Sequence, residues 1–173
     1  MKLVDKTCES TEWWTPPEIL EPVRNFFGGP IEFDPATHRS NPTEAKGYLC
    51  VGGLEARWPG RLKTFVNPPY GGQLLRWVEK IVNAAALTSQ PLVALLPGQR
   101  FETRTWQQVL LPASSLSAVV FIQGRVKFLR PDGARAKSNP YGSMLYLFNV
   151  EDDARDECAA AFRPLGYLQW WDR

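Results

Sequence analysis

Short apolar runs and longer segments of helical periodicity alternate along the 173 residues of the chain. Apolar runs bounded by glycine, proline or polar residues predict strands at 31–34, 47–51, 64–66, 91–97, 117–122, 126–128, 143–150 and 165–171. Helical spacing of apolar residues predicts helices at 16–27 and 73–86, and an acidic, then alanine-rich stretch predicts a solvated helix at 151–163. We also expect a helical turn at 43–47 and a helix entered from the polar segment 98–108.

The first helix has a defined start in the sequence. Thr15 is expected to be its N-cap, Pro16 its first helical residue, and Glu18 the partner of Thr15 in a capping box. The glycines and the proline at 28–30 end the helix. An N-terminus of this kind attracts a carboxylate, so Thr15 can cap the helix and contact a ligand at the same time.

Strands that alternate with helices imply an α/β fold with a mostly parallel, doubly wound sheet, and we expect an antiparallel edge. The run 91–97 is bounded by prolines and apolar between them, which is typical of a parallel strand buried on both faces. No segment is left for a separate recognition domain. We therefore expect one domain over residues 1–173, with residues 1–11 as a loose arm because they lack periodicity.

Composition narrows the class of protein. Hydrophobic residues make up 44% and charged residues 22%, values of a globular domain, and no apolar run is long enough to cross a membrane. The single histidine, His38, makes a Ser–His or Cys–His catalytic pair improbable. The three cysteines show no metal spacing and are odd in number, which indicates a reducing, cytoplasmic compartment and no bound metal.

The stretch that carries chemistry is Asn67-Pro68-Pro69-Tyr70, which follows the apolar run 64–66. Neither proline has an N–H to donate to a ladder, so the strand must stop at Asn67. Each proline also favours an extended conformation in the residue before it, and Pro69 stiffens the loop. The Asn67 side chain is thereby held at the carboxyl edge of the sheet, where ligands bind in open α/β sheets.

This loop suits methyl transfer to an exocyclic amine. The amide oxygen of Asn67 and the backbone carbonyl of Pro68 can each accept one amino hydrogen of an adenine, which aims the nitrogen lone pair at a methyl donor. Acceptors fixed in advance in this way are what electrostatic catalysis requires. Tyr70 would offer its ring for stacking the base after the base has left the duplex.

Positive charge is concentrated in one part of the chain. The net charge is only +2, but the segment between Pro97 and Pro140 alone carries +5. Its basic residues are Arg100, Arg104, Arg125, Lys127, Arg130, Arg135 and Lys137, against the acids Glu102 and Asp132. We expect this cluster to contact DNA phosphates, with Arg100, Arg104, Arg125 and Lys127 as the principal candidates.

The chain resembles a known family. Asn67-Pro68-Pro69-Tyr70 is similar to the catalytic tetrapeptide of S-adenosylmethionine-dependent amino methyltransferases, and other stretches resemble the small phage-type DNA N-6-adenine methyltransferases. These stretches occur in the family's order, from about residue 12 to about residue 150, and are Glu12–Glu18, Phe33–Ala36, Trp58–Arg61, Leu95–Pro97, Phe121–Phe128 and Tyr141–Ser143.

The resemblance implies a Rossmann-like methyltransferase fold, S-adenosyl-L-methionine as cofactor, double-stranded DNA as partner, and a monomer or weak homodimer in the cytoplasm of a bacterial or phage-infected cell. The cofactor-binding positions that it implies are Trp14, Thr15, Pro16, Asp34, Pro35, Ala36, Gly53 and Leu54. One departure stands out: Gly52 occupies the place of a family acid, and Glu55 lies nearby but out of register.

Two other functions remain open from the sequence. Asn-Pro-Pro-Tyr also suits the amide nitrogen of a protein glutamine, although the basic segment and the phage-type pattern argue against that substrate. The missing acid at Gly52 is compatible with a non-catalytic, DNA-binding relic of the fold. Transfer of methyl to DNA rather than protein excludes the first alternative, and cofactor binding excludes the second.

Overall fold

The computed structural model describes residues 13–136 and 141–171. The expected loose arm at 1–11 and the basic residue Lys137 lie outside these residues. Seven strands form one sheet in the order β2-β1-β3-β4-β6-β5-β7. Their bounds are β1 Phe33–Asp34, β2 Gly47–Tyr48, β3 Thr64–Val66, β4 Leu92–Pro97, β5 Leu116–Ile122, β6 Ser143–Phe148 and β7 Gly166–Trp170.

The sheet is parallel in one half and antiparallel in the other. The pairs β1–β2, β1–β3 and β3–β4 are parallel, whereas β4–β6, β5–β6 and β5–β7 are antiparallel. Strands β1 to β5 all run in one direction, so most strands are parallel in orientation as predicted, but the antiparallel part is half of the sheet rather than an edge. A strand that returns parallel to its predecessor needs a crossover connection, which is usually a helix. The Gly- and Pro-containing segment 123–136 forms no helix, and β6 returns antiparallel to β5.

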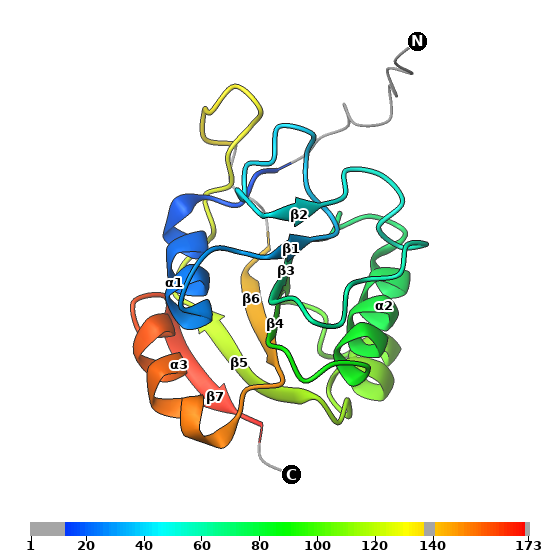
Figure 1. The fold of residues 1–173 in the computed structure, drawn as a ribbon, viewed down its shortest axis with the longest axis vertical. Coiled ribbons are helices and arrows are strands. Elements are labelled where there is room, and N and C mark those ends of the chain that lie inside the picture. The colour runs from blue at the N-terminus through cyan, green and yellow to red at the C-terminus, as the bar shows by residue number, and fades with distance from the viewer. Residues whose placement is uncertain (1–12, 137–140, 172–173) are drawn as a thin grey trace.

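Helices cover both faces of the sheet (Figure 1), as expected for an α/β fold. Helices α1 (Pro17–Phe27) and α3 (Arg155–Phe162, preceded by the 3-10 turn η3, Asp152–Ala154) lie on one face. Helix α2 (Leu74–Ala86) and the π-helical turn η2 (Trp106–Leu110) lie on the other. None of the described helices combines the length and the apolar composition that a bilayer crossing requires.

The central position of β4 in the sheet explains why its sequence is apolar at consecutive positions. Val93 and Leu95 pack into the core under α1 and α3, and Ala94 and Leu96 pack into the core under α2. All four side chains are fully buried. A strand covered on both faces needs apolar residues at every position, as the prediction for 91–97 assumed.

Helix α1 begins one residue later than predicted. Pro16 is the N-cap, with an extended ψ of 158°, and Pro17 is the first helical residue. The prediction was wrong because the residue before a proline is sterically kept out of the helical region, and Pro16 precedes Pro17. Thr15 therefore does not cap α1, and the N-cap makes no side-chain hydrogen bond, so the capping box with Glu18 does not form.

Two further local predictions were wrong, and a third was confirmed. Residues 43–47 form no helical turn, because the Asn41 side chain bonds both the N–H and the carbonyl of Ala45, and Asn41 and Glu44 have positive φ. Residues 126–128 form no strand, and pairing begins only at Leu129, as an isolated bridge. The segment 98–108 does run into a helical turn, as expected: it is α-helical at Arg104 and Thr105 and π-helical over η2.

Candidate active site

The order of the strands creates a switch point between β1 and β3. The chain passes from β1 to β2 on one side and then returns to place β3 on the other side of β1. Ligands of open α/β sheets bind at the carboxyl ends of the strands at such a point. Asp34 is the last residue of β1, and Asn67 directly follows the last residue of β3, so both lie at this edge.

Asn67 is held by the segment that precedes α1. Its amide nitrogen Nδ2 donates to the Thr15 hydroxyl oxygen at 3.1 Å and lies 3.5 Å from the carbonyl oxygen of Trp13. Because that carbonyl can only accept, the amide nitrogen must face the segment, and Oδ1 is the atom left to accept from a ligand. The following Pro68 is buried and Pro69 is exposed, which anchors one side of the loop.

Tyr70 is fixed through its hydroxyl group. The hydroxyl donates to the carbonyl oxygen of Leu95 at 3.1 Å. β3 ends opposite Ala94 in the ladder, so the next carbonyl of β4 is available to the loop instead of to a strand. Burial raises the pKa of the Tyr70 phenol, which keeps it a neutral donor. Its ring lies edge-on to Phe128, with a centroid distance of 6.5 Å and an interplanar angle of 85°.

Asp34 is a buried carboxylate, 2% exposed. Oδ1 accepts from the backbone N–H of Ala36 at 3.0 Å, and Oδ2 accepts from the Thr43 hydroxyl at 2.8 Å. Burial raises the pKa of Asp34 from 3.8 to about 6, although both hydrogen bonds act in the opposite direction. The two hydrogen bonds fix the loop that follows β1, so Asp34 has a structural role at the switch point.

The Trp14-Thr15-Pro16 segment lies beside these two strand ends. The indole nitrogen Nε1 of Trp14 is buried and has no hydrogen-bond partner among the described residues. The Trp14 ring contacts His38 at 5.6 Å between centroids. Burial, and then the charge of Arg39, lower the pKa of His38. Residues 16 and 17 are prolines, so the N-terminus of α1 offers fewer backbone N–H donors to a ligand than an ordinary helix N-terminus does. The Trp14 indole N–H is a donor in the same region.

Gly53 is a glycine because another backbone approaches it. A Cβ at this position would lie 2.0 Å from the carbonyl oxygen of Pro35, so the loops after β1 and β2 touch here. Ala36 and Leu54 are half-buried against the core under α2. Gly52 has a φ of +73°, which a carboxylate side chain adopts only with strain.

The acid Glu55, two residues after Gly53, forms an ion pair at the surface. Its carboxylate lies 3.5 Å from the guanidinium of Arg76, and both side chains are largely exposed. The pair lies on the surface beside α2. The exposed pair contributes little to stability.

A comparison with models of protein families finds a match to the DNA N-6-adenine-methyltransferase (Dam) family over residues 5–159. The chain belongs to the Dam family. Its function is therefore that of a DNA adenine-N6 methyltransferase, and DNA is its substrate. Nothing favours protein glutamine as substrate or a non-catalytic relic. No curated protein sequence matches the chain.

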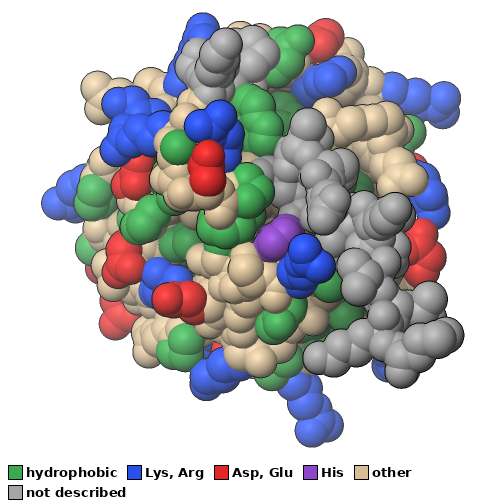
Figure 2. Space-filling view, turned by 90° about the horizontal axis from the view of Figure 1, so that it is seen from above, with side chains coloured by type: hydrophobic (Ala, Val, Ile, Leu, Met, Phe, Trp, Pro, Cys, Tyr) green, Lys and Arg blue, Asp and Glu red, His purple; other side chains and the backbone are tan. Residues whose placement is uncertain are grey.

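The basic residues of this Dam-family chain lie on segments that leave the same edge as Asn67. Arg100 and Arg104 follow β4, and Arg125 and Lys127 follow β5, and all four are exposed. Both strands run in the direction of β3, so their carboxyl ends share its edge. Figure 2 shows this end of the molecule, where Lys and Arg side chains are interspersed with Asp, Glu and hydrophobic side chains.

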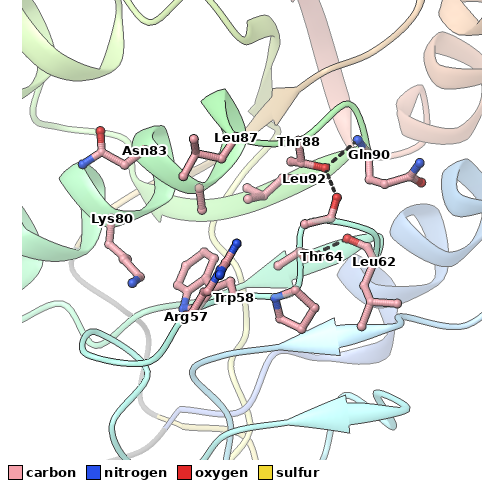
Figure 3. A pocket seen from close by; sticks show the side chains of 13 residues that line it. Arg57, Trp58, Leu62, Thr64, Lys80, Asn83, Leu87, Thr88, Gln90 and Leu92 are labelled. Carbon is pink, nitrogen blue, oxygen red and sulfur yellow. Dashed lines mark hydrogen bonds between the residues drawn. The ribbon is translucent and has the colours of Figure 1, made fainter.

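A cavity of about 250 Å³ lies at the opposite edge of the sheet (Figure 3). It is lined by Thr64 and Leu92, the first residues of β3 and β4, whereas Asn67 follows the last residue of β3. Several of its polar groups are already paired. Lys80 Nζ donates to the Ala56 carbonyl at 2.6 Å and lies over the Trp58 ring. This cavity is therefore separate from the Dam-family site.

Sequence reasoning missed four residues near the candidate site. Thr43, the donor to Asp34, has no signal in the sequence beyond a turn. Trp13 and Phe128, whose rings lie 5.6 Å apart, come from segments more than a hundred residues apart. His38 was considered only as a catalytic partner of Ser or Cys, and its contact is instead with Trp14. Phe128 could have been suspected, since it ends one of the motifs that resemble the Dam family.

Proposed function

We propose that the chain transfers a methyl group from S-adenosyl-L-methionine to the exocyclic amine of an adenine extruded from duplex DNA. The observation that carries the proposal is the amide of Asn67, which is oriented with its nitrogen toward Thr15 and its oxygen available to a ligand. It stands at the carboxyl end of β3, next to the buried acid that ends β1. An acceptor is thus adjacent to a place where a cationic donor would be stabilised.

The residues at the switch point fit the donor. S-Adenosylmethionine carries a carboxylate, an ammonium group and a sulfonium. The indole N–H of Trp14, which has no partner among the residues that the structure describes, is a donor suited to the carboxylate. Asp34 is an acceptor suited to an ammonium or hydroxyl group. We infer that Trp14, Thr15 and Pro16 bind one part of the donor, with Asp34, Pro35, Ala36, Gly53 and Leu54 around the rest.

When bound, the donor supplies an electrophilic methyl group on sulfur. Asn67 Oδ1 and the Pro68 carbonyl accept the two hydrogens of the adenine amine. These contacts draw the nitrogen toward tetrahedral geometry and free its lone pair, which is otherwise delocalised into the ring. Pro69 keeps the loop rigid, so the acceptors require no reorganisation in the transition state.

Tyr70 and the basic segments serve the nucleic acid. The hydroxyl bond to Leu95 holds the Tyr70 ring in place, so the ring is a fixed surface for the extruded base. Arg100, Arg104, Arg125 and Lys127 are placed on segments that leave the same edge, where phosphate contacts would position the duplex. Specificity for a target sequence must come from loops, since the described chain forms one sheet with its helices.

Calorimetric titration with S-adenosylmethionine tests the donor site. Asp34→Ala should weaken donor binding by about 1–3 kcal/mol, the usual cost of losing a hydrogen bond to a charged group. Asp152→Ala, on an exposed turn before α3, is the matched control and should bind like the wild type. Equal affinity of the Asp34→Ala variant and the wild type would move the donor away from β1.

A further inference from the structure

One three-residue segment contacts both the catalytic loop and the basic loop after β5. Trp14 exchanges two backbone hydrogen bonds with Leu129, at 2.8 and 2.9 Å. On the other side of the same segment, Trp13 and Thr15 provide the acceptors for the Asn67 amide nitrogen. The orientation of Asn67 therefore depends on a segment that is itself bound to Leu129.

Phe128 makes a second connection between the same parts. Its ring is 2% exposed and lies 5.6 Å from the Trp13 ring and 6.5 Å from the Tyr70 ring, centroid to centroid. Two neighbouring residues of one loop, Phe128 and Leu129, thus contact the Trp13–Thr15 segment that holds Asn67, and Phe128 also contacts the ring of Tyr70. A displacement of this loop would move both side chains that face the base.

The loop is a cross-linked hairpin rather than an open connection. We define it as residues 128–136. Ala136 N–H donates to the Phe128 carbonyl, Arg130 N–H donates to the Ala134 carbonyl, and Gly133 N–H closes the turn on Arg130, each at 2.8 Å. The hairpin projects from the body of the molecule at the end where β2 lies (Figure 1). Its outer part carries the exposed Arg130 and Arg135.

We propose that Thr15 is a positioning residue for Asn67 and that hairpin 128–136 holds Thr15 in place. An asparagine amide can rotate to exchange its oxygen and nitrogen, and the exchanged form would present a donor to the adenine amine, which is itself a donor. The Trp13 carbonyl, which can only accept, disfavours that alternative, and Thr15 Oγ1 accepts from the same Nδ2 and holds the amide at the segment. The inference rests on the proposed role of Asn67 as acceptor, and it adds the residues that set its orientation.

The first test observes the contact without requiring activity. In ¹⁵N-labelled protein, the side-chain NH₂ of Asn67 is identified by its absence in Asn67→Asp. Its protons should be protected from solvent exchange in the wild type and in Thr15→Ser, and exposed in Thr15→Val. The NH₂ of Asn149, which donates to the carbonyls of Ala85 and Thr88 at 2.9 and 3.0 Å, is an internal control that should not change. Unchanged Asn67 protection in Thr15→Val would overturn the proposal.

The same signal tests the hairpin. Leu129→Pro removes the N–H that donates to the Trp14 carbonyl, and Phe128→Leu keeps an apolar side chain but removes the ring between Trp13 and Tyr70. Both variants should lower the protection of Asn67 while Asn149 stays protected. If Asn67 keeps its protection in both variants, the hairpin does not hold Thr15.

A double-mutant cycle tests the consequence for catalysis. At saturating donor and DNA, Thr15→Val should lower kcat about tenfold, the equivalent of one net hydrogen bond, and Thr15→Ser should restore it. Asp at position 67 has two equivalent acceptor oxygens, so in the Asn67→Asp background Thr15→Val should cost only about twofold. An equal loss in both backgrounds would show that Thr15 acts independently of the amide. Protection without any methyl transfer by the wild type would refute the proposed function but not the contact.

Discussion

The buried carboxylate of Asp34 makes the stability of the fold depend on pH in a predictable direction. Burial raises its pKa from 3.8 to about 6 in the folded protein. Between these values the folded chain binds more protons than the unfolded chain, so stability falls as the pH rises. The contribution of Asp34 is fully present below pH 3.8 and is lost as the pH rises through 6. At about 1.4 kcal/mol per pH unit, the loss is on the order of 3 kcal/mol.

The Asp34→Asn variant isolates this contribution. Its amide oxygen can still accept from the Ala36 N–H, and its amide nitrogen can donate to the Thr43 hydroxyl, but it does not ionise. Urea unfolding of both proteins from pH 4 to pH 8 gives the difference between their unfolding free energies at each pH. The contributions of the other titrating groups are the same in both proteins and cancel in this difference. Between pH 4 and pH 7 we expect the unfolding free energy of the variant to rise relative to that of the wild type by about 2 kcal/mol, because part of the loss has already occurred at pH 4.

Asp152→Asn controls for the loss of a carboxylate from an exposed position. A difference between wild type and Asp34→Asn that stays constant from pH 4 to pH 7 would show that Asp34 does not titrate with a raised pKa in the folded protein. A rise in the unfolding free energy of the wild type relative to that of the variant with rising pH would contradict the prediction as well, since that is the behaviour of a carboxylate stabilised in its charged form.

Two further predictions concern the backbone contact at the switch point and the approach of DNA. Gly53→Ala should lower the free energy of unfolding by about 3 kcal/mol, because the added Cβ would overlap the Pro35 carbonyl. The neighbouring Gly52 has open space around it, so Gly52→Ala should lower the free energy of unfolding by only about 1 kcal/mol, through its positive φ alone. Denaturant titration of both variants decides this, and equal losses would contradict the contact. Arg100→Ala and Arg125→Ala should each lower the slope of log affinity for duplex DNA against log salt by about one, while Arg57→Ala at the opposite edge should leave it unchanged. An unchanged slope in both would place the DNA on another surface.

The parts of the fold that could be predicted are those determined by neighbouring residues. Pro68 and Pro69 end β3 by removing two N–H groups, and this effect is independent of distant contacts. Helix 73–86 was predicted to within one residue because its apolar face repeats at helical spacing. The continuous apolar run of β4 indicated burial on both faces, which the two cores confirm.

The parts that could not be predicted depend on residues far apart in the sequence. Thr15 has the chemistry of an N-cap, but its hydroxyl accepts from an amide 52 residues away instead. Phe128 reads as part of a strand, yet it packs between Trp13 and Tyr70. The antiparallel half of the sheet follows from a connection without a helix, and a glycine- and proline-containing segment does not reveal on which side of the sheet the chain returns.

The central claim is that Asn67 holds and polarises the adenine amine. The most direct measurement is the rate of N6-methyladenine formation in duplex DNA, by nucleoside mass spectrometry, together with calorimetric donor binding. Asn67→Ala should lower kcat by about two to three orders of magnitude, as for the loss of a preorganised acceptor or donor, and leave donor affinity within a few fold. Asn67→Asp should retain partial activity because a carboxylate still accepts. Wild-type rates in Asn67→Ala, or a loss of donor binding in the folded variant, would contradict the assignment.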